Sequence, residues 1–446
     1  MLWRRHCGNG RTMKPTRETA ARRLARWPTV AIVVAIVAVT LRPIGSEVTP
    51  SFNWCIACSE LGTLDLLYNI ALFLPLGVLL GWSGVSALRA LVLSAVLSTT
   101  VEVLQLLVVP GRDPTFVDIL SNSLGGALGV PLARAPSALR SASARAWRFL
   151  GWTWVVLSLG VIMLGAWVVS VDVPPNDYYV QWLPQREGYA RFGGELRSFQ
   201  VNGVDLPAAA RIPAGRLPDA FFGGEIDASA RLTSGEPNNG IALIARLALE
   251  YGEFLMFGRQ DNALVVRYRS NAPKVGVRSP VYALPGAFSV DPRAELEVRA
   301  IKLGDDISLQ ARQINGNGAF SRSWQQRITA ARFWAALLPL ERGFGVLGVV
   351  GDVLWIALLA VPTAYAAARM YRRALQALPT LVQGAGIALI ASTQQTSLWW
   401  WPVWLGFAAG AVAGAWLGNR AHRRFLLSPP AYSELASTKK QGALSR

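Results

Sequence analysis

Apolar runs of membrane-spanning length constrain this chain more than any other feature of its sequence. A helix that crosses a bilayer needs about 20 mostly apolar residues, because each residue advances the helix by about 1.5 Å. Runs that approach this length lie at residues 28–45, 64–82, 87–109, 115–133, 149–170, 343–366, 379–396 and 399–418. The composition, 52% hydrophobic and 16% charged, is also too apolar for an ordinary soluble protein. The sequence therefore predicts a multi-pass α-helical membrane protein with about 8 transmembrane helices.

Basic residues indicate the orientation of these helices. The formal net charge is +17, and Lys and Arg cluster beside the apolar runs, within residues 4–26, 134–148, 369–373 and 420–424. Short basic segments that flank membrane helices face the cytoplasm, and counting the crossings places all these clusters on one side. We therefore expect an inner (plasma) membrane protein with both termini in the cytoplasm. No basic patch is interleaved with stacking aromatic residues, so no nucleic-acid partner is expected.

The segment between residues 174 and 335 has a different pattern. Apolar and polar residues alternate there, as in GGEIDASARL (223–232) and AELEVRAI (294–301), and turn residues separate the alternating stretches. Such alternation predicts an antiparallel β-sandwich, which the crossing count places outside the cytoplasm. The run EFLMFGRQDNALVVRYRSN (253–271) resembles the laminin-G and concanavalin-like sandwich families, which implies a glycan or protein partner. Tyr178, Tyr179 and Trp182 could stack on sugars, although strand packing is the commoner use of such side chains.

These patterns give a linear organisation for the chain. It comprises a basic cytoplasmic tail (1–27), a first membrane domain (28–135), a cytoplasmic loop with the fifth transmembrane helix (136–173), the extracytoplasmic sandwich (174–335), three C-terminal transmembrane helices (343–418) and a cytoplasmic tail (419–446).

Polar side chains interrupt neighbouring transmembrane segments at similar depth toward the outer leaflet. Helical spacing places Glu102 and Gln105 on one face of the third segment, and Asp118 and Asn122 on one face of the fourth. The second segment contributes Asn69. An unpaired charge at bilayer depth costs about 3 kcal/mol on insertion scales. We therefore expect these side chains to face one another in a shared pocket.

The GRDP turn between the third and fourth segments adds a cation and another acid at the mouth of this pocket. The candidate catalytic residues are Glu102, Arg112 and Asp118, and the candidate substrate-binding residues are Asn69, Gln105, Asp113 and Asn122. Arginine binds carboxylate or phosphate groups in a bidentate manner, so the pocket suits an amphiphile such as a phospholipid or a lipid-linked sugar. Both histidines, His6 and His422, fall on the cytoplasmic side, so we expect no metal site in the pocket, and we expect no cofactor.

The combined motifs resemble the VanZ-like family. They are N-x3-F-x-P-x-G at residues 69–77, E-x2-Q at 102–105, Arg112, Asp118 and N-x2-G at 122–125, and they fall within residues 28–135. The family is named for a membrane protein linked to teicoplanin resistance, so the resemblance implies a role in the cell envelope without defining a reaction. Two functions stay open. One is binding or processing of a lipid-linked or cell-wall precursor, and the other is a non-catalytic membrane scaffold whose sandwich recognises glycan or protein.

Overall fold

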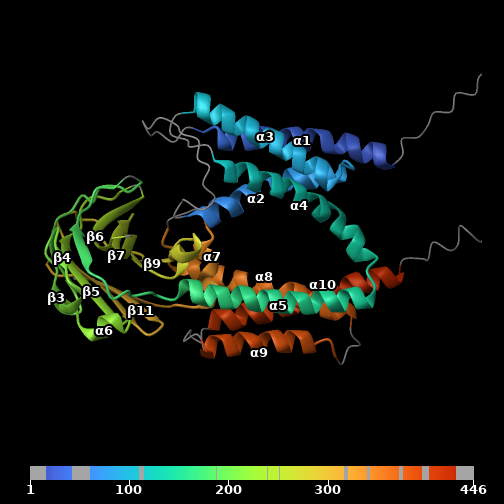
Figure 1. Ribbon diagram of the computed structural model, residues 1–446. Helices are drawn as coiled ribbons and strands as arrows, with labels where there is room; N and C mark the ends of the chain where they lie inside the picture. The colour runs from blue at the N-terminus through green and yellow to red at the C-terminus, as the bar shows by residue number, and fades with distance from the viewer. Residues whose placement is uncertain are drawn as a thin grey trace, which may run out of the picture. The chain divides into compact units, whose positions relative to one another are not determined.

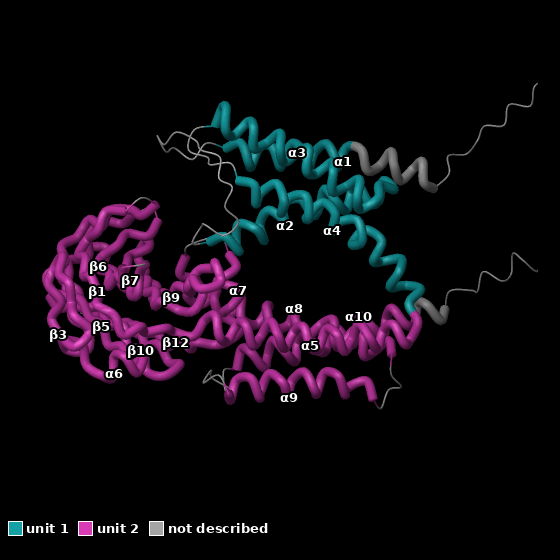
Figure 2. The backbone as a smooth tube through the Cα atoms, viewed as in Figure 1, with its two compact units in different colours: residues 1–142 teal, residues 143–446 magenta. Residues whose placement is uncertain are grey.

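The structure is a computed structural model, in which the described residues are 17–42, 61–109, 115–186, 188–238, 240–250, 252–315, 320–338, 342–370, 375–393 and 401–427. The chain forms two compact units, residues 1–142 and residues 143–446 (Figure 2). The first unit is helical, whereas the second combines helices with two β-sheets (Figure 1).

The described residues of the first unit form four long helices. They are α1 (Arg17–Thr40), α2 (Gly62–Trp82), α3 (Ala87–Val108) and α4 (Phe116–Arg140). The buried side chains of Ile36, Phe73 and Leu76 form an apolar core between α1 and α2. Helices α2 and α4 approach so closely that a Cβ at Gly77 would lie 2.1 Å from the carbonyl oxygen of Gly126. Small residues at such positions let helix backbones pack against each other in a membrane, where the hydrophobic effect does not drive helix association.

The second unit has a helical part built on the same principle. Its long helices are α5 (Ala144–Val169), α8 (Val346–Met370), α9 (Leu378–Thr393) and α10 (Trp401–Leu427). Helix α10 carries a glycine at every fourth position, at residues 406, 410, 414 and 418. A Cβ at Gly410 would lie 2.4 Å from the carbonyl oxygen of Ala357, and one at Gly414 would lie 2.3 Å from that of Val361. The glycine stripe therefore sets the close packing of α10 on α8.

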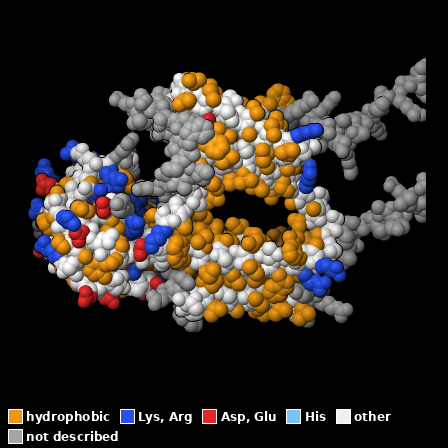
Figure 3. Space-filling view, viewed as in Figure 1, with side chains coloured by type: hydrophobic (Ala, Val, Ile, Leu, Met, Phe, Trp, Pro, Cys, Tyr) orange, Lys and Arg blue, Asp and Glu red, His pale blue; other side chains and the backbone are white. Residues whose placement is uncertain are grey.

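The surfaces of these helices suit an apolar solvent. Among the described residues, six helices are long and apolar enough to cross a membrane, namely α2, α3, α4, α5, α8 and residues Trp401–Arg423 of α10. Apolar side chains cover much of the helical surface in Figure 3, and Leu107, Phe149 and Val412 are each at least 70% exposed. The predicted segments at 28–45 and 379–396 correspond to shorter apolar helices, Trp27–Thr40 and Leu378–Thr393. A membrane protein is therefore supported, and the count of about eight crossings stays a prediction.

Residues 178–327 form the β-sandwich that the alternating pattern predicts. One antiparallel sheet has the order β4 (Arg211–Ile212), β1 (Tyr178–Trp182), β6 (Ile241–Leu249), β7 (Gly252–Gln260), β8 (Ala263–Tyr268) and β9 (Val281–Leu284). The other has the order β12 (Ser321–Arg327), β11 (Asp306–Gln313), β10 (Glu295–Leu303), β5 (Ile226–Thr233), β2 (Leu196–Val201) and β3 (Val204–Asp205). Short helical turns lie in the connections, at η1 (Ala214–Arg216), α6 (Asp219–Phe222) and η2 (Ala272–Val275).

The core of the sandwich explains several aromatic residues. Tyr178 is fully buried and packs edge-on against Phe221 and Phe254, while its hydroxyl donates to the carbonyl oxygen of Pro174 at 2.6 Å. Burial raises the pKa of this hydroxyl, with a further contribution from the charge of Asp172. Strand packing, rather than sugar stacking, is therefore the role of Tyr178.

Polar contacts join the sandwich to the helices of its own unit. The side chain of Asn271 donates to the carbonyl oxygen of Trp167 at 3.1 Å and to the hydroxyl of Ser170 at 2.9 Å, at the end of α5. The chain leaves β12 through η3 (Ala330–Arg332) and α7 (Phe333–Ala336) before it enters α8. The sandwich is therefore attached at both of its ends.

Candidate functional site

Glu102 and Asp118 both contact Thr115, which caps the N-terminus of α4, Glu102 through its carboxylate and Asp118 through its backbone N–H. The Thr115 hydroxyl accepts a hydrogen bond from the backbone N–H of Asp118 at 3.1 Å. The backbone N–H of Thr115 donates in turn to Oε2 of Glu102 at 3.0 Å. A helix N-terminus presents unpaired N–H groups and partial positive charge, so it stabilises carboxylates placed there. This capping explains how the Glu102 carboxylate is satisfied in an apolar helical unit.

The second helix joins this network through Asn69. Its side-chain amide donates to Oδ1 of Asp118 at 2.5 Å, which links α2 to α4. The local sequence supports the arrangement, because Phe73, a fully buried core residue of α2, lies four positions after Asn69. A polar contact and an apolar contact on one helical face thus hold α2 in place.

One turn further along α4, Asn122 forms a second polar contact. Its amide donates to the hydroxyl of Ser98 on α3 at 2.9 Å, and the two side chains are 3% and 0% exposed. The carbonyl oxygen Oδ1 of Asn122 and the hydroxyl of Ser94 are buried without a hydrogen-bond partner among the described residues. Unsatisfied buried polar groups of this kind cost about 1–3 kcal/mol each. They are therefore an energetic cost of packing α3 against α4.

Gln105 completes the set by reaching the first helix. Its amide donates to the carbonyl oxygen of Thr40, the last residue of α1, at 2.8 Å. Gln105 and Glu102 are 6% and 4% exposed, as expected for residues three positions apart on one buried helix face. The amide thus satisfies a carbonyl that the end of α1 leaves unpaired.

The structure brings together five of the seven candidate residues. Contacts that connect the four described helices of the first unit involve Glu102, Asp118, Asn69, Gln105 and Asn122. Arg112 and Asp113 lie outside the described residues. The sequence interpretation missed the hydroxyl partners Thr115 and Ser98, because hydroxyl groups in helices commonly bond to their own backbone, as Thr100 does with the carbonyl oxygen of Val96 at 2.8 Å.

A second buried acid lies in the other unit and was also missed. Asp352 of α8 is fully buried and accepts two hydrogen bonds from Arg332, at 3.0 and 2.9 Å. The indole N–H of Trp334 donates to the same carboxylate at 2.8 Å. Because all three donors come from neighbouring residues of the link between β12 and α8, this acid positions the sandwich on its helices and has a structural role.

Comparison with known proteins agrees with the helical motifs. Residues 18–138 match the family model described as VanZ/LLP1. This range includes all seven candidate residues and lies within the first unit. No curated protein and no solved structure matches the chain. The first unit therefore carries a VanZ-like membrane domain, and the laminin-G or concanavalin-like identity of the sandwich stays a prediction.

Proposed function

We propose that this protein acts in the cell envelope by binding or processing a lipid-linked or cell-wall precursor at the outer leaflet. In this proposal Glu102, Arg112 and Asp118 act on the polar headgroup, while Asn69, Gln105, Asp113 and Asn122 orient it. The acyl part of the precursor lies along the apolar helices. Membrane lipid surrounds the helices, and the precursor reaches the site from the same membrane.

One observation supports the proposal, namely that Thr115 at the N-terminus of α4 donates its backbone N–H to the Glu102 carboxylate and accepts the backbone N–H of Asp118. The Asp118 carboxylate lies in the first turn of the same helix and accepts a hydrogen bond from Asn69. A helix N-terminus is a ready binding site for phosphate or carboxylate groups. Carboxylates that occupy such a site can accept a proton or a hydrogen bond from a headgroup hydroxyl. Arg112, in the segment that precedes α4 in the sequence, supplies the charge that a phosphate requires. The carboxylates and the arginine would therefore act on the headgroup by proton transfer or by electrostatic stabilisation.

The alternative is a non-catalytic membrane scaffold whose sandwich recognises a glycan or a protein. A specific observation favours it. Among the described residues, the hydrogen bonds that Asn69, Gln105 and Asn122 donate from their side chains all end on another helix. Amides join membrane helices in this way without any ligand. The close contact of Gly77 with Gly126 strengthens the same structural interpretation.

Ligand-induced stabilisation separates the two functions. The full chain is reconstituted in nanodiscs with or without undecaprenyl phosphate, and thermal unfolding is followed by tryptophan fluorescence. A ligand at 100 times its Kd stabilises a protein by about 2.7 kcal/mol. We expect undecaprenyl phosphate to stabilise wild type in this way. Glu102→Gln preserves the size of the side chain and should lose the stabilisation. Its melting temperature without ligand should stay close to that of wild type.

Thr100→Val is the matched control, because Thr100 lies on the same helix, is exposed and bonds only to its own backbone among the described contacts. It should change neither the ligand-free melting temperature nor the stabilisation. If Glu102→Gln lowers the ligand-free melting temperature and undecaprenyl phosphate stabilises no variant, including wild type, the scaffold is the correct function.

A further inference from the structure

The loop between β1 and β2 contains a polar recess on the sandwich. The loop leaves β1 and returns to β6, where the backbone N–H of Leu183 donates to the carbonyl oxygen of Ile244 and that of Ala190 to Ile241, both at 2.9 Å. Leu183 has a φ of 48°, a conformation that costs a non-glycine residue about 1–3 kcal/mol. The anchored loop therefore has a defined and locally strained shape.

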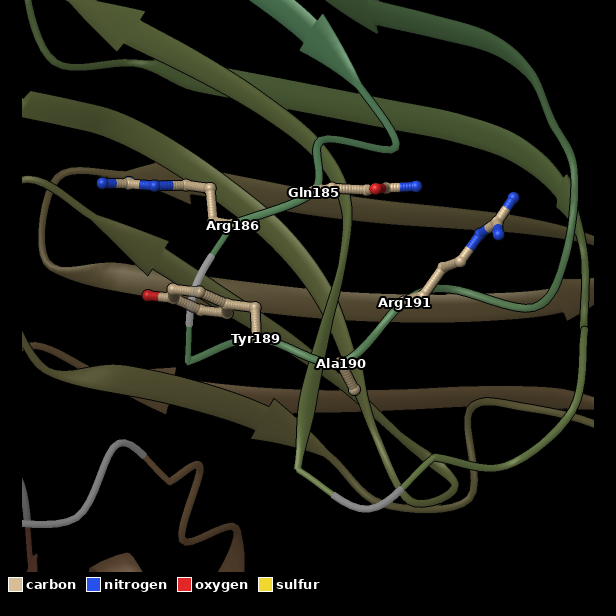
Figure 4. Close-up of a pocket in the computed structure, with 5 residues that line it drawn as sticks. All are labelled: Gln185, Arg186, Tyr189, Ala190 and Arg191. Carbon is tan, nitrogen blue, oxygen red and sulfur yellow. The ribbon is translucent and has the colours of Figure 1, made fainter. Parts of the chain in front are cut away.

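The recess has a volume of about 420 Å³ and is lined by Gln185, Arg186, Tyr189, Ala190 and Arg191 (Figure 4). This volume lies in the range of small-molecule sites, about 300–1,000 Å³. Among the described lining residues, the methyl group of Ala190 is the largest aliphatic side chain. Such a lining offers hydrogen bonds and positive charge, and the Tyr189 ring is its largest apolar surface, so it favours a polar anion over an acyl chain.

The charges around the recess are mostly positive. Arg186 and Arg191 are exposed, and neither forms an ion pair with the residues that the structure describes. Arg246 donates to the side-chain oxygen of Gln181 at 2.6 Å, and burial and the charge of Arg186 lower its pKa. Mutual repulsion of guanidinium groups is relieved when an anion binds between or beside them. Glu187, in the same loop, lies outside the described residues.

A neutralised arginine fixes the aromatic wall of the recess. Arg267 forms an ion pair with Glu253 at 2.8 Å and donates to the hydroxyl of Tyr189 at 3.0 Å. The Tyr189 ring packs against the apolar cluster that includes Ile241 and Leu243. The phenol is therefore held in one position, which lowers the entropy cost of binding a ligand.

The two exposed arginines point in opposite directions. In Figure 4 the side chains of Arg186 and Tyr189 extend toward one end of the loop, and those of Arg191 and Gln185 extend toward the other. Each end thus pairs a guanidinium with a neutral group that hydrogen-bonds hydroxyls. Because the two guanidinium groups point apart, a chain with repeated anionic groups fits this arrangement better than a single small anion does.

We propose that this loop binds an extended acidic glycan, with one anionic sugar beside Arg186 and Tyr189 and a second beside Arg191 and Gln185. Guanidinium groups bind the carboxylate or phosphate in a bidentate manner. The amide and phenol bond the sugar hydroxyls. An acidic glycan is thus the ligand class that we assign to the sandwich. This assignment does not depend on the proposed roles of Glu102 and Asp118.

Ligand length and charge test this proposal in the full chain in detergent. Binding of trigalacturonate, monomeric galacturonate and neutral maltotriose is measured by isothermal titration calorimetry. We expect trigalacturonate to bind at least about tenfold more tightly than the monomer, because the second contact is intramolecular. Maltotriose should not bind. Arg186→Gln and Arg191→Gln should each weaken trigalacturonate binding about tenfold, which corresponds to 1.4 kcal/mol.

Arg216→Gln is the matched control, because Arg216 is exposed on η1 of the same sandwich. It should bind the trimer as wild type does, and Glu102→Gln should do so as well. Equal affinity for monomer and trimer, or binding of maltotriose, would overturn the proposal. So would binding confined to phosphatidylglycerol vesicles. Because both arginines are exposed, unchanged melting temperatures of the variants confirm that any loss is not due to unfolding.

Discussion

Arg332 and Asp352 form a bidentate ion pair at 3.0 and 2.9 Å, and their side chains are 2% and 0% exposed. The pair connects the segment that leaves the sandwich to the first turns of α8. Its surroundings leave no spare room, because a Cβ at Gly348 would lie 2.7 Å from the guanidinium of Arg332. Burial of two charges is costly, and only complete pairing offsets that cost. The additional bond from Trp334 at 2.8 Å supplies part of the pairing.

Removal of one partner should therefore be strongly destabilising. Arg332→Gln or Asp352→Asn leaves the other charge buried, which costs about 3–5 kcal/mol. Thermal unfolding of the full chain in detergent measures the effect. The double variant Arg332→Met with Asp352→Leu should be more stable than either single variant. Arg312→Gln is the control, because its pair with Glu297 is 66% and 28% exposed, and its loss should cost less than about 1 kcal/mol.

The glycine stripe of α10 gives a second prediction. Gly410→Ala places a methyl group 2.4 Å from the carbonyl oxygen of Ala357, so α10 must move away from α8. Overpacking of this kind costs about 1–3 kcal/mol. Gly160→Ala on α5 is the matched control, because its Cβ meets no atom within 4 Å, and alanine should stabilise that helix by about 0.5–1 kcal/mol. Equal melting temperatures of the two variants in detergent would contradict close packing at Gly410.

The alternation of apolar and polar residues predicted a large part of the β-sandwich. The alternating stretches at residues 223–232 and 294–301 correspond to β5 and β10, where buried positions recur at every second residue. The short strands β3 and β4 have two residues each, so they are too short to show alternation. The repeat of Gly406 to Gly418 is visible at four-residue spacing, and the sequence interpretation overlooked it.

The site roles of the candidate residues stay a prediction, and only part of their contacts could be expected from the sequence. Helical spacing predicted that Glu102 and Asp118 face neighbouring helices, because acids in apolar helices must be satisfied by neighbouring groups. The contact of Glu102 with Thr115 was not evident, since it is made by a backbone N–H, which carries no sequence signal. The pairing of Arg332 with Asp352 was also hidden, because the two residues belong to different elements and no helical spacing relates them.

The contact between Asn122 and Ser98 supports a third prediction. Interhelical hydrogen bonds in membranes contribute about 0.6 kcal/mol on average and up to about 1.7 kcal/mol. A double-mutant cycle with Asn122→Leu and Ser98→Ala should give a coupling energy in this range, measured by unfolding in mixed detergent. A coupling of zero would mean that the 2.9 Å contact does not hold α3 to α4.

Asp305, in the turn between β10 and β11, should make the sandwich less stable as the pH rises. Burial raises the pKa of this carboxyl to about 6, from an ordinary value of 3.8, although Lys302 opposes the change. The folded state therefore holds the proton more tightly than the unfolded state, and its stabilisation is lost as the pH rises from about 4 to about 6. A shift of this size corresponds to at most about 3 kcal/mol, and partial exposure reduces it to about 1 kcal/mol.

Asp305→Asn should remove this pH dependence. The free energy of unfolding of the variant, taken relative to wild type, should therefore be about 1 kcal/mol higher at pH 7.5 than at pH 4. Unfolding of the full chain at both pH values measures the difference. Asp177→Asn is the control, because the Arg211 side chain lowers the pKa of Asp177, so the stabilisation from its ionised form is lost only below pH 3.8. That variant should keep the wild-type slope between pH 4 and 6. The same slope in Asp305→Asn would mean that burial at this turn does not control the titration.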